Sequence, residues 1–380
     1  MAPDSDIQVL VVGAGTGGLS LAGFLEWAGF DPVLIERAET PARPHGVVEL
    51  WPDAVALLDR LGVGEAVRDA GQCVTTWKRR QADGTVTARL DADTAFGFVA
   101  VEYARLRAQL RDAVSDEALH AEATLRTLDS RRSGVTVEFT NGVREPFDLV
   151  VGADGVHSHT RGLLGGGEPT FCGTTSVALP LDAGAVLQGA NEVWTADGAV
   201  FRAVPVGEAD AAGWLTVPTT VPGQDWSDAA ALADCCPEID WLLPEVLESV
   251  GVEDLWWADD FRMPTTCWAD DRVALLGDAA HARHPLTGVD ATLAIEDAAV
   301  LASELIERAD PPAARLADYA ARRQSRLDQL GDHSGRSPLA GIDSELADRQ
   351  PSVPEIRGAR LASCFGSDSP TPVDVRPEDD

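Results

Sequence analysis

The sequence predicts an α/β protein in which a domain built on a parallel sheet is interleaved with a second, β-rich domain. Three observations predict this fold class. An apolar strand runs into a glycine-rich turn, a helix and a second strand within residues 7–36. Two later segments, residues 148–151 and 272–276, each begin with one charged residue and continue as the apolar run of a strand buried on both faces. Between them, residues 165–266 carry short β-like runs, many glycines and prolines, and clustered tryptophans.

The parallel-sheet domain is therefore expected to be discontinuous. A chain of 380 residues is longer than most single hydrophobic cores, which favours two units. The expected boundaries are 1–72, 99–164 and 267–310 for the parallel-sheet domain, 73–98 and 165–266 for the β-rich domain, 311–335 for a C-terminal helical segment, and 336–380 for an acidic, loosely ordered tail.

Apolar periodicity and turn residues predict the individual elements. Residues 7–12 form a strand, 19–28 a helix closed by Gly29, and 33–35 a second strand. Residues 73–98 alternate as short strands do. The other expected helices are 53–62, 103–113, 228–250, 290–308 and 313–330, and the other expected strands are 135–139, 148–151 and 272–276.

The charge balance narrows the classes of partner. The chain has 62 acidic and 30 basic residues, and Lys78 is its only lysine, so its formal net charge is -32. A nucleic acid duplex or an anionic membrane surface would repel such a protein, which excludes nucleic acid as an expected partner. The acidity resembles that of proteins from salt-loving microbes. No apolar run has the length of a membrane span, and the acidic start MAPDSDIQVL lacks a basic signal-peptide region, so a cytoplasmic location is expected.

The cysteines and histidines give no metal-binding pattern. Six cysteines are present without a C-x-x-C pair, and they are expected to be reduced, structural thiols. His157 with His159, and His281 with His284, have no further residues at ligand spacing. No metal site is predicted.

The glycine-rich turn carries the first binding motif. Gly13 permits the tight turn, Gly15 lets a pyrophosphate approach the N-terminus of the helix, and Gly18 lets helix and strand pack closely. Glu36, followed by Arg37, ends the second strand, where a carboxylate can accept hydrogen bonds from a ribose. Strand, glycines, helix and acid together predict dinucleotide binding. The alternative is a tight strand–helix turn in another α/β fold, which leaves Glu36 unexplained.

Two further motifs follow buried strands. Residues 148–161 (DLVVGADGVHSHTR) run from a strand into an Asp-Gly turn followed by Ser and Arg. Residues 272–281 (RVALLGDAAH) run from another strand into Gly-Asp, and Pro285, Gly288 and a long helix follow. With the glycine motif, and in this order, these segments resemble the FAD-dependent, single-component aromatic hydroxylases of the para-hydroxybenzoate hydroxylase type. The resemblance implies a three-layer, Rossmann-like FAD-binding domain interleaved with a β-sheet substrate domain, plus C-terminal helices.

The resemblance also implies roles for individual residues. Glu36 would bind the adenosine ribose, Arg43 would reach the FAD pyrophosphate, and Asp278 would hydrogen-bond the ribityl chain. The segment from Pro285 to Gly288 would line the flavin ring. The full set of implied cofactor-binding residues is Gly13, Gly15, Gly18, Glu36, Arg37, Arg43, Arg107, Asp154, Gly155, Arg161, Gly277, Asp278, Pro285, Gly288 and Asp290.

Two of these segments leave alternatives open. Asp154 and Gly155 would lie near the FAD phosphates, a region that the family also associates with the nicotinamide, and Arg161 would support their turn. Asp278 could instead be a helix N-cap. A structural role is favoured over proton transfer for the two histidines of residues 281–284.

The sequence departs from the family pattern at three places. Asp290 stands where the family commonly has glycine, and its carboxylate could either oppose the negative charge of a reduced flavin or point to solvent at the helix start. Tyr103 stands where the family commonly has arginine, and Arg105 and Arg107 are expected to face other sides of that helix. The usual Pro-Asn reads Pro-Asp at residues 52–53.

The predicted function is that of a flavoprotein monooxygenase with non-covalent FAD. The resemblance implies that NADH or NADPH reduces the flavin, that O₂ forms a C4a-hydroperoxyflavin, and that one oxygen atom enters an aromatic or apolar ring. No side chain is assigned as a catalyst, because the cofactor carries the chemistry. The tryptophan-rich layer is expected to form the far wall of the pocket. The alternatives are a flavin-dependent isoprenoid reductase and a flavin-binding protein with little turnover. Halogenation is disfavoured because the W-x-W-x-I-P signature is absent.

Overall fold

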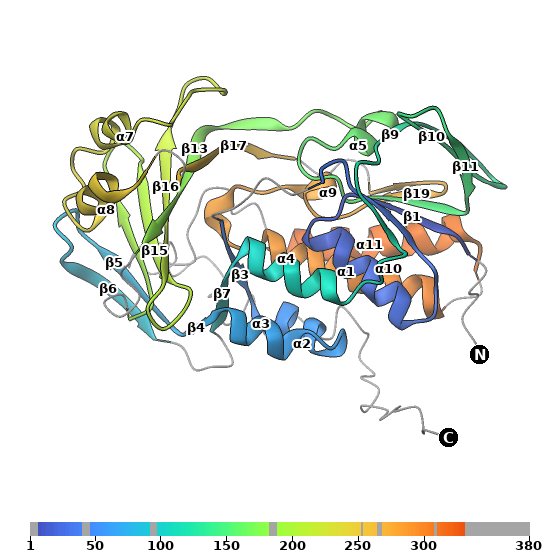
Figure 1. The fold of residues 1–380 in the computed structure, drawn as a ribbon, viewed down its shortest axis with the longest axis horizontal. Helices are drawn as coiled ribbons and strands as arrows, with labels where there is room; N and C mark the ends of the chain where they lie inside the picture. The colour runs from blue at the N-terminus through green and yellow to red at the C-terminus, as the bar shows by residue number, and fades with distance from the viewer. Residues whose placement is uncertain are drawn as a thin grey trace.

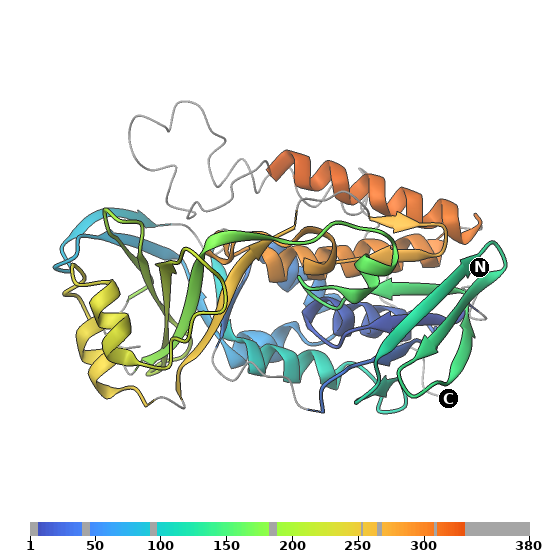
Figure 2. The same ribbon diagram turned by 90° about the horizontal axis from the view of Figure 1, so that it is seen from above.

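The computed structural model describes residues 7–39, 46–91, 97–181, 188–251, 254–263, 268–307 and 310–330, so Arg43 and the expected tail lie outside the described residues. A seven-stranded sheet lies at one end of an elongated molecule (Figure 1), and a six-stranded sheet with most of the helices lies at the other. The view from above shows the two last helices side by side along the second of these regions (Figure 2). In the described ranges, no helix is both long enough and apolar enough to cross a bilayer.

The six-stranded sheet is the centre of the second, helix-rich region. Four of its five strand pairings, those from β19 to β8, are parallel, and only the edge strand β18 runs antiparallel to its neighbour. This is the sheet that the buried apolar runs predict. The order of its strands is β18 (Ala269–Asp270), β19 (Val273–Leu275), β12 (Leu149–Gly152), β1 (Val9–Val12), β2 (Val33–Ile35) and β8 (Leu119–His120).

Alternating side chains build a layer on each face of this sheet. Val9 and Val11 pack into the cluster that includes the helices, whereas Leu10 and Val12 pack against an antiparallel three-stranded sheet. The Rossmann-like, three-layer α/β architecture is thereby confirmed. The covering elements are α1 (Thr16–Trp27) and α10 (Asp290–Glu307) on the helical face, and β9 (Leu125–Arg131), β10 (Gly134–Phe139) and β11 (Arg144–Phe147) on the other.

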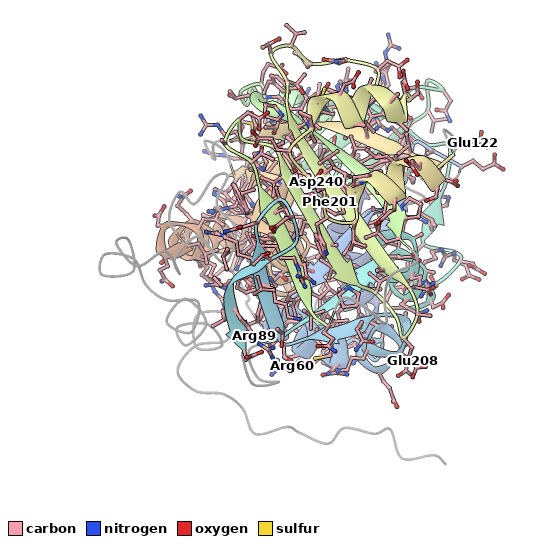
Figure 3. The ribbon with its side chains drawn as sticks, turned by 90° about the vertical axis from the view of Figure 1, so that its left-hand side faces the viewer. Arg60, Arg89, Glu122, Phe201, Glu208 and Asp240 are labelled. Carbon is pink, nitrogen blue, oxygen red and sulfur yellow. The ribbon has the colours of Figure 1, made fainter. Side chains whose placement is uncertain are left out.

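The seven-stranded sheet is antiparallel except where β14 pairs with β5. Two short helices, α7 (Ala229–Cys235) and α8 (Leu243–Ser249), cover one face, which includes Phe201 (Figure 3). The helical stretch predicted near 228–250 is divided into these two helices, because Pro237 has no amide hydrogen to continue the first of them. The strand order is β17 (Trp256–Arg262), β13 (Thr170–Leu181), β16 (Ala211–Pro218), β15 (Val200–Pro205), β14 (Ala190–Trp194), β5 (Thr76–Arg80) and β6 (Val86–Asp91).

A small antiparallel sheet lies where the two regions meet. It contains β3 (Val47–Leu50), β7 (Phe98–Glu102) and β4 (Gln72–Val74). Trp51 and Phe98 of this part pack with Trp77 and Val204 of the seven-stranded sheet in one buried cluster. Burial of these large side chains holds the two sheets in a fixed relation. The helices beside the small sheet are α2 (Pro52–Arg60), α3 (Gly64–Ala70) and α4 (Tyr103–Asp112).

Candidate cofactor and substrate site

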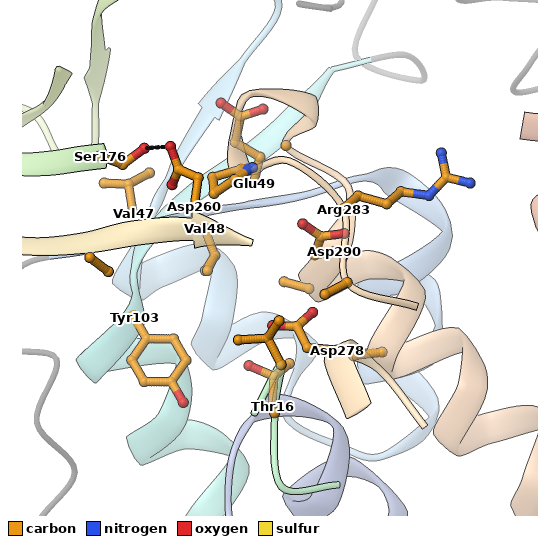
Figure 4. Close-up of a pocket in the computed structure, with 18 of the residues that line it drawn as sticks. Thr16, Val47, Val48, Glu49, Tyr103, Ser176, Asp260, Asp278, Arg283 and Asp290 are labelled. Carbon is orange, nitrogen blue, oxygen red and sulfur yellow. Dashed lines mark hydrogen bonds between the residues drawn. The ribbon is translucent and has the colours of Figure 1, made fainter. Parts of the chain in front are cut away.

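A cavity of about 340 Å³ opens between the glycine turn and the inner face of the seven-stranded sheet. Thr16 of the turn lies at one side of it, and the hydrogen-bonded pair of Ser176 and Asp260 lies at another (Figure 4). Asp278 and Asp290 project between them. Three sheets and the loops after β1, β12 and β19 therefore converge on one pocket, which is the usual place for a ligand in a parallel α/β fold.

The glycines of the first turn are required by close backbone packing. Gly13 has a φ of +106°, and a Cβ there would lie 2.5 Å from the carbonyl oxygen of Ala153. A Cβ on Gly18 would lie 1.9 Å from the carbonyl oxygen of Gly13. A Cβ on Gly15 would meet only the Tyr103 hydroxyl, at 3.6 Å, so this position leaves room for a ligand. The structure thus separates two packing glycines from the one that faces the cavity.

Gly17 is a further glycine that the motif does not single out. A Cβ on Gly17 would lie 2.3 Å from the Cδ1 atom of Leu276, which follows β19. Gly17 and Leu276 both line the cavity. Since the contact joins residues far apart in the chain, the local sequence gave no signal for it.

Glu36 ties the end of β2 to the glycine turn. Its carboxylate accepts hydrogen bonds from the backbone N–H groups of Ala14, at 2.9 Å, and Ala38, at 3.0 Å. The half-buried carboxylate thereby fixes the turn that would receive the cofactor, whereas the neighbouring Arg37 is exposed. Neither residue lines the cavity.

Arg107 lies on the same side of α4 as Tyr103. Its Nε atom donates a 3.0 Å hydrogen bond to the carbonyl oxygen of Ala14, while the Tyr103 hydroxyl faces Gly15. The prediction that Arg107 faces another side of the helix is wrong, because residues four apart lie one turn above each other. A guanidinium therefore reaches the glycine turn from one turn further along the helix.

The Asp-Gly turn after β12 is held by α5 (His159–Leu163). The Asp154 carboxylate accepts hydrogen bonds from the Ser158 hydroxyl and from the N–H and hydroxyl groups of Thr160. Gly155, with a φ of +80°, lines the cavity instead of Asp154. The buried Arg161 donates to the carbonyl oxygen of Val156, and so supports this turn without reaching the cavity.

The Gly-Asp motif after β19 forms another border of the cavity. Gly277, with a φ of +58°, is the N-cap of α9 (Asp278–His281), and its N–H donates to the Asp297 carboxylate at 2.7 Å. Asp278 is the first helical residue and makes no capping hydrogen bond, so the N-cap alternative for it is wrong. Its side chain borders the cavity instead.

The segment from Pro285 to Asp290 closes the cavity. Pro285 begins a single 3₁₀ turn (Pro285–Thr287), and Gly288 follows with a φ of +61°. A Cβ on Gly288 would lie 2.4 Å from the Oε2 atom of Glu49. Asp290 begins α10, and its Oδ1 atom is buried without a hydrogen-bond partner among the described residues. Its carboxylate thus lies in the cavity, not in solvent, and burial and the nearby Asp278 raise its pKa to about 7.

A network of buried charged side chains holds the Gly-Asp turn in place on the side away from the cavity. The Asp297 carboxylate lies 2.6 Å from His281 Nε2 and accepts a hydrogen bond from Arg323. Arg323 and Arg326 also donate to Glu296. Burial alone would raise the pKa of Asp297, but His281 and Arg323 lower it to about 2. His281 thus has structural partners, in agreement with the role expected for it.

A second polar cluster lies on the inner face of the seven-stranded sheet. The buried Asp260 accepts hydrogen bonds from Thr174, at 2.7 Å, and Ser176, at 2.9 Å. Behind them, His284 Nε2 lies 2.9 Å from the Thr174 hydroxyl, and His284 Nδ1 accepts the N–H of Leu286. Burial raises the pKa of Asp260 to about 7 and lowers the pKa of His284 to about 4.

The guanidinium at this side of the cavity is Arg202, on β15. Its Nη2 atom lies 2.9 Å from Glu49 Oε1, and its Nε atom lies 3.4 Å from Glu192 Oε1. All three side chains are buried, and burial raises the pKa of Glu49. Sequence reasoning missed these residues and Asp260, since they come from strands of two sheets and form no local motif.

The residues present fit FAD. The Gly15 position leaves room at the start of α1 for a phosphate group, and the Asp278 carboxylate can accept hydrogen bonds from hydroxyl groups. The Trp214 and Trp256 side chains, whose ring centroids lie 6.3 Å apart, line the far side of the cavity, as expected for the tryptophan-rich layer.

Comparison with known proteins agrees with this assignment. Residues 6–334 match a family model described as an FAD binding domain. The aurachin C monooxygenase/isomerase of Stigmatella aurantiaca is 30% identical over 336 residues, covering 85% of this chain and 87% of that protein. The 3-amino-4-hydroxybenzoate 2-monooxygenase PtmB3 of Streptomyces platensis is 29% identical over 359 residues, covering 90% and 89%.

Solved structures show the same fold. The crystal structure of Klebsiella pneumoniae HpxO, complexed with FAD and uric acid, superposes with a TM-score of 0.79 at 23% identity, covering 95% of this chain and 96% of that one. The chain belongs to the FAD binding domain family and is an FAD-dependent monooxygenase of the aromatic hydroxylase type.

Proposed function

We propose that this protein hydroxylates an aromatic substrate with one oxygen atom of O₂, using NADH or NADPH as the reductant. The observation that carries the proposal is the set of residues that line the cavity. The residues suited to the flavin ring, from Pro285 to Asp290, border the same space as two tryptophan side chains, Trp214 and Trp256. A flat ring between such surfaces buries apolar area on both faces. The relatives named above are called monooxygenases, which supports the same reaction type.

The residues of the glycine turn and of the loop after β19 would hold the cofactor. The N-terminus of α1 would receive the pyrophosphate, with Arg107 close to the turn. Asp278 would accept hydrogen bonds from the ribityl hydroxyl groups. When bound, FAD would supply the redox and oxygen chemistry.

The loop before α10 would orient the flavin ring. The left-handed conformation of Gly288 turns the backbone toward Glu49 and so shapes this border of the cavity. The N-terminus of α10 stabilises negative charge at its first turn, whereas an ionised Asp290 opposes it. The protonation state of Asp290 therefore tunes the electrostatics at this point.

Domain organisation and location are part of the proposal. Residues 1–72, 99–164 and 267–310 form the cofactor domain, and 73–98 and 165–266 form the substrate domain. A cytoplasmic location would supply NADH and NADPH, and it is supported by the free thiols of Cys73, Cys172, Cys235 and Cys236.

The purified protein tests the proposal directly. It should be yellow, and acid precipitation should release FAD into the supernatant, since no described residue of the site calls for a covalent link. Oxidation of NADH or NADPH should be stimulated by an aromatic substrate and accompanied by O₂ uptake. Reduction of a substrate without O₂ uptake would favour a reductase. Flavin retention without turnover on a broad aromatic panel would favour a binding protein.

A further inference from the structure

The cation that the seven-stranded sheet contributes to the cavity is already neutralised. Arg202 lies between Glu49, at 2.9 Å, and Glu192, at 3.4 Å, and the side chains of all three are at most 7% exposed. Even with Glu49 protonated, the guanidinium would remain beside the Glu192 carboxylate. A buried cation with carboxylates on two sides has no positive charge left for an anionic ligand.

The other lining residues place no positive charge beside Asp260, because the charged group that acts on this carboxyl is the neighbouring Asp259 carboxylate. Among the described residues that line the cavity, the second cation is Arg283, whose charge partly offsets the rise in the Asp290 pKa and whose side chain points away from Ser176 and Asp260 (Figure 4). The lining residues include no lysine and no histidine. The chain's only lysine, Lys78, lies in β5 and does not border the cavity.

The polar group that a substrate would meet is the Asp260 carboxyl, which already accepts hydrogen bonds from two hydroxyl groups. Asp260 and Ser176 border the cavity, while Thr174 and His284 lie behind them (Figure 4 shows the first pair). Thr174 and Ser176 both donate to the same Asp260 oxygen, Oδ2. The groups that face Asp260 are thus neutral hydroxyls and His284, whose Nε2 lies 3.8 Å away, together with the adjacent carboxylate of Asp259.

From this charge pattern we infer that the pocket takes an uncharged aromatic ring with a hydroxyl or N–H donor directed at Asp260, and rejects aromatic carboxylates. The inference rests on the proposed monooxygenase function and names its substrate class. A carboxylate entering this cavity would lose its hydration beside Glu49 and Asp260 without gaining a cationic partner. An uncharged hydroxyl or N–H donor loses much less hydration free energy than a carboxylate, and it donates a hydrogen bond to the Asp260 carboxylate. The preference differs from the benzoate in the name of the Streptomyces platensis relative.

Ligand binding to the FAD-loaded protein tests this preference. The ligands are matched pairs of hydroxylated aryl carboxylic acids and their primary amides, titrated at pH 7.5 while the flavin absorbance spectrum is followed. We expect each amide that binds to have a Kd at least tenfold lower than that of its acid. Methylation of the ring hydroxyl should raise the Kd of the amide by a similar factor. Equal or tighter binding of the acids would overturn the inference.

A double variant without the two carboxylates beside Arg202 provides the second test of the preference for amides. Glu49→Gln combined with Glu192→Gln leaves Arg202 without a carboxylate and should lower the Kd of the acids, so that the preference for amides shrinks at least fivefold. The matched control is Glu208→Gln, an exposed position between β15 and β16, which should keep the wild-type preference. An unchanged preference in the double variant would contradict the role of the pair. The titrations need neither NADH nor O₂, so their failure is distinct from a failure of the turnover test.

Discussion

Asp290 begins α10 with its carboxylate in the cavity, where burial and Asp278 raise its pKa to about 7. Below pH 7 the group is mostly neutral and can donate a hydrogen bond. Above pH 7 it is mostly ionised and opposes further negative charge nearby. A single side chain thereby makes the electrostatics of the proposed flavin site depend on pH across the neutral range.

Replacing Asp290 with Asn should raise the midpoint potential of the bound flavin at pH 8.5 and change it much less at pH 5.5. At high pH the expected rise is roughly 20–30 mV, which for a two-electron couple corresponds to about 1–1.4 kcal/mol. Spectroelectrochemical titration at the two pH values measures it, with the exposed Asp240→Asn as the control. The same shift at both pH values would show that Asp290 does not titrate in this range.

Glu36→Ala should weaken FAD binding, because the carboxylate holds the glycine turn through two backbone N–H groups. The loss of a charge-assisted hydrogen bond is worth about 1.5–3 kcal/mol, so the Kd for FAD should rise by about 10- to 150-fold. Fluorescence titration of the FAD-depleted protein measures the Kd. The exposed Glu39→Ala is the control and should bind FAD as the wild type does. Equal affinity of the Glu36 variant would remove this residue from the site.

At the scale of elements, α11 (Pro312–Leu330) stabilises the site without touching the cavity. Arg323 joins Asp297 and Glu296 of α10, and Asp297 in turn accepts the N–H of Gly277 at the Gly-Asp turn. Helix α11 is therefore coupled through Asp297 to the Gly-Asp turn, which borders the proposed flavin site. This coupling is an ion network in a buried position, where the loss of one member leaves the others uncompensated.

Asp297→Asn should destabilise the protein by about 3–5 kcal/mol at pH 7. The folded pKa of Asp297, about 2, lies below the ordinary unfolded value of about 3.9. Its stabilising contribution is therefore present above pH 4 and is lost as the pH falls toward 2. Urea unfolding at pH 7 and pH 3.5 should show a smaller difference from the wild type at the lower pH. The exposed Asp328→Asn should unfold like the wild type at both.

Local patterns predicted most of the elements, because buried strands and amphipathic helices leave a periodic signal. The parallel strands and the glycine turn appear where apolar runs and glycines place them. The break at Pro237 was missed, although a proline inside a helical pattern is itself a signal that the helix ends before it. Arg107 was assigned to the wrong side of α4, although its spacing of four from Tyr103 contains the signal. The ion pairs of Arg202 with Glu49 and Glu192 could not be predicted from the sequence, because they join strands that are far apart in the chain.

At the scale of the whole molecule, the net charge of -32 favours stability in salt. Repulsion between surface carboxylates extends over a Debye length of about 3 Å at 1 M salt but about 30 Å at 0.01 M, so the total repulsion is much larger at low salt. The melting temperature should therefore be higher at 1 M than at 0.01 M sodium chloride. Thermal unfolding followed by circular dichroism at both concentrations measures it, and equal midpoints would contradict adaptation to high salt.

The proposed reaction transfers one oxygen atom of O₂ to a substrate bound in the cavity between the two sheets. The FAD-loaded protein, supplied with NADH or NADPH and a panel of uncharged hydroxyarenes, should be incubated under ¹⁸O₂ and its products measured by mass spectrometry. We expect a product that gains one ¹⁸O atom, with O₂ consumption that rises when this substrate is present. A product without ¹⁸O, or substrate reduction without O₂ consumption, would contradict the assignment of this protein as a monooxygenase.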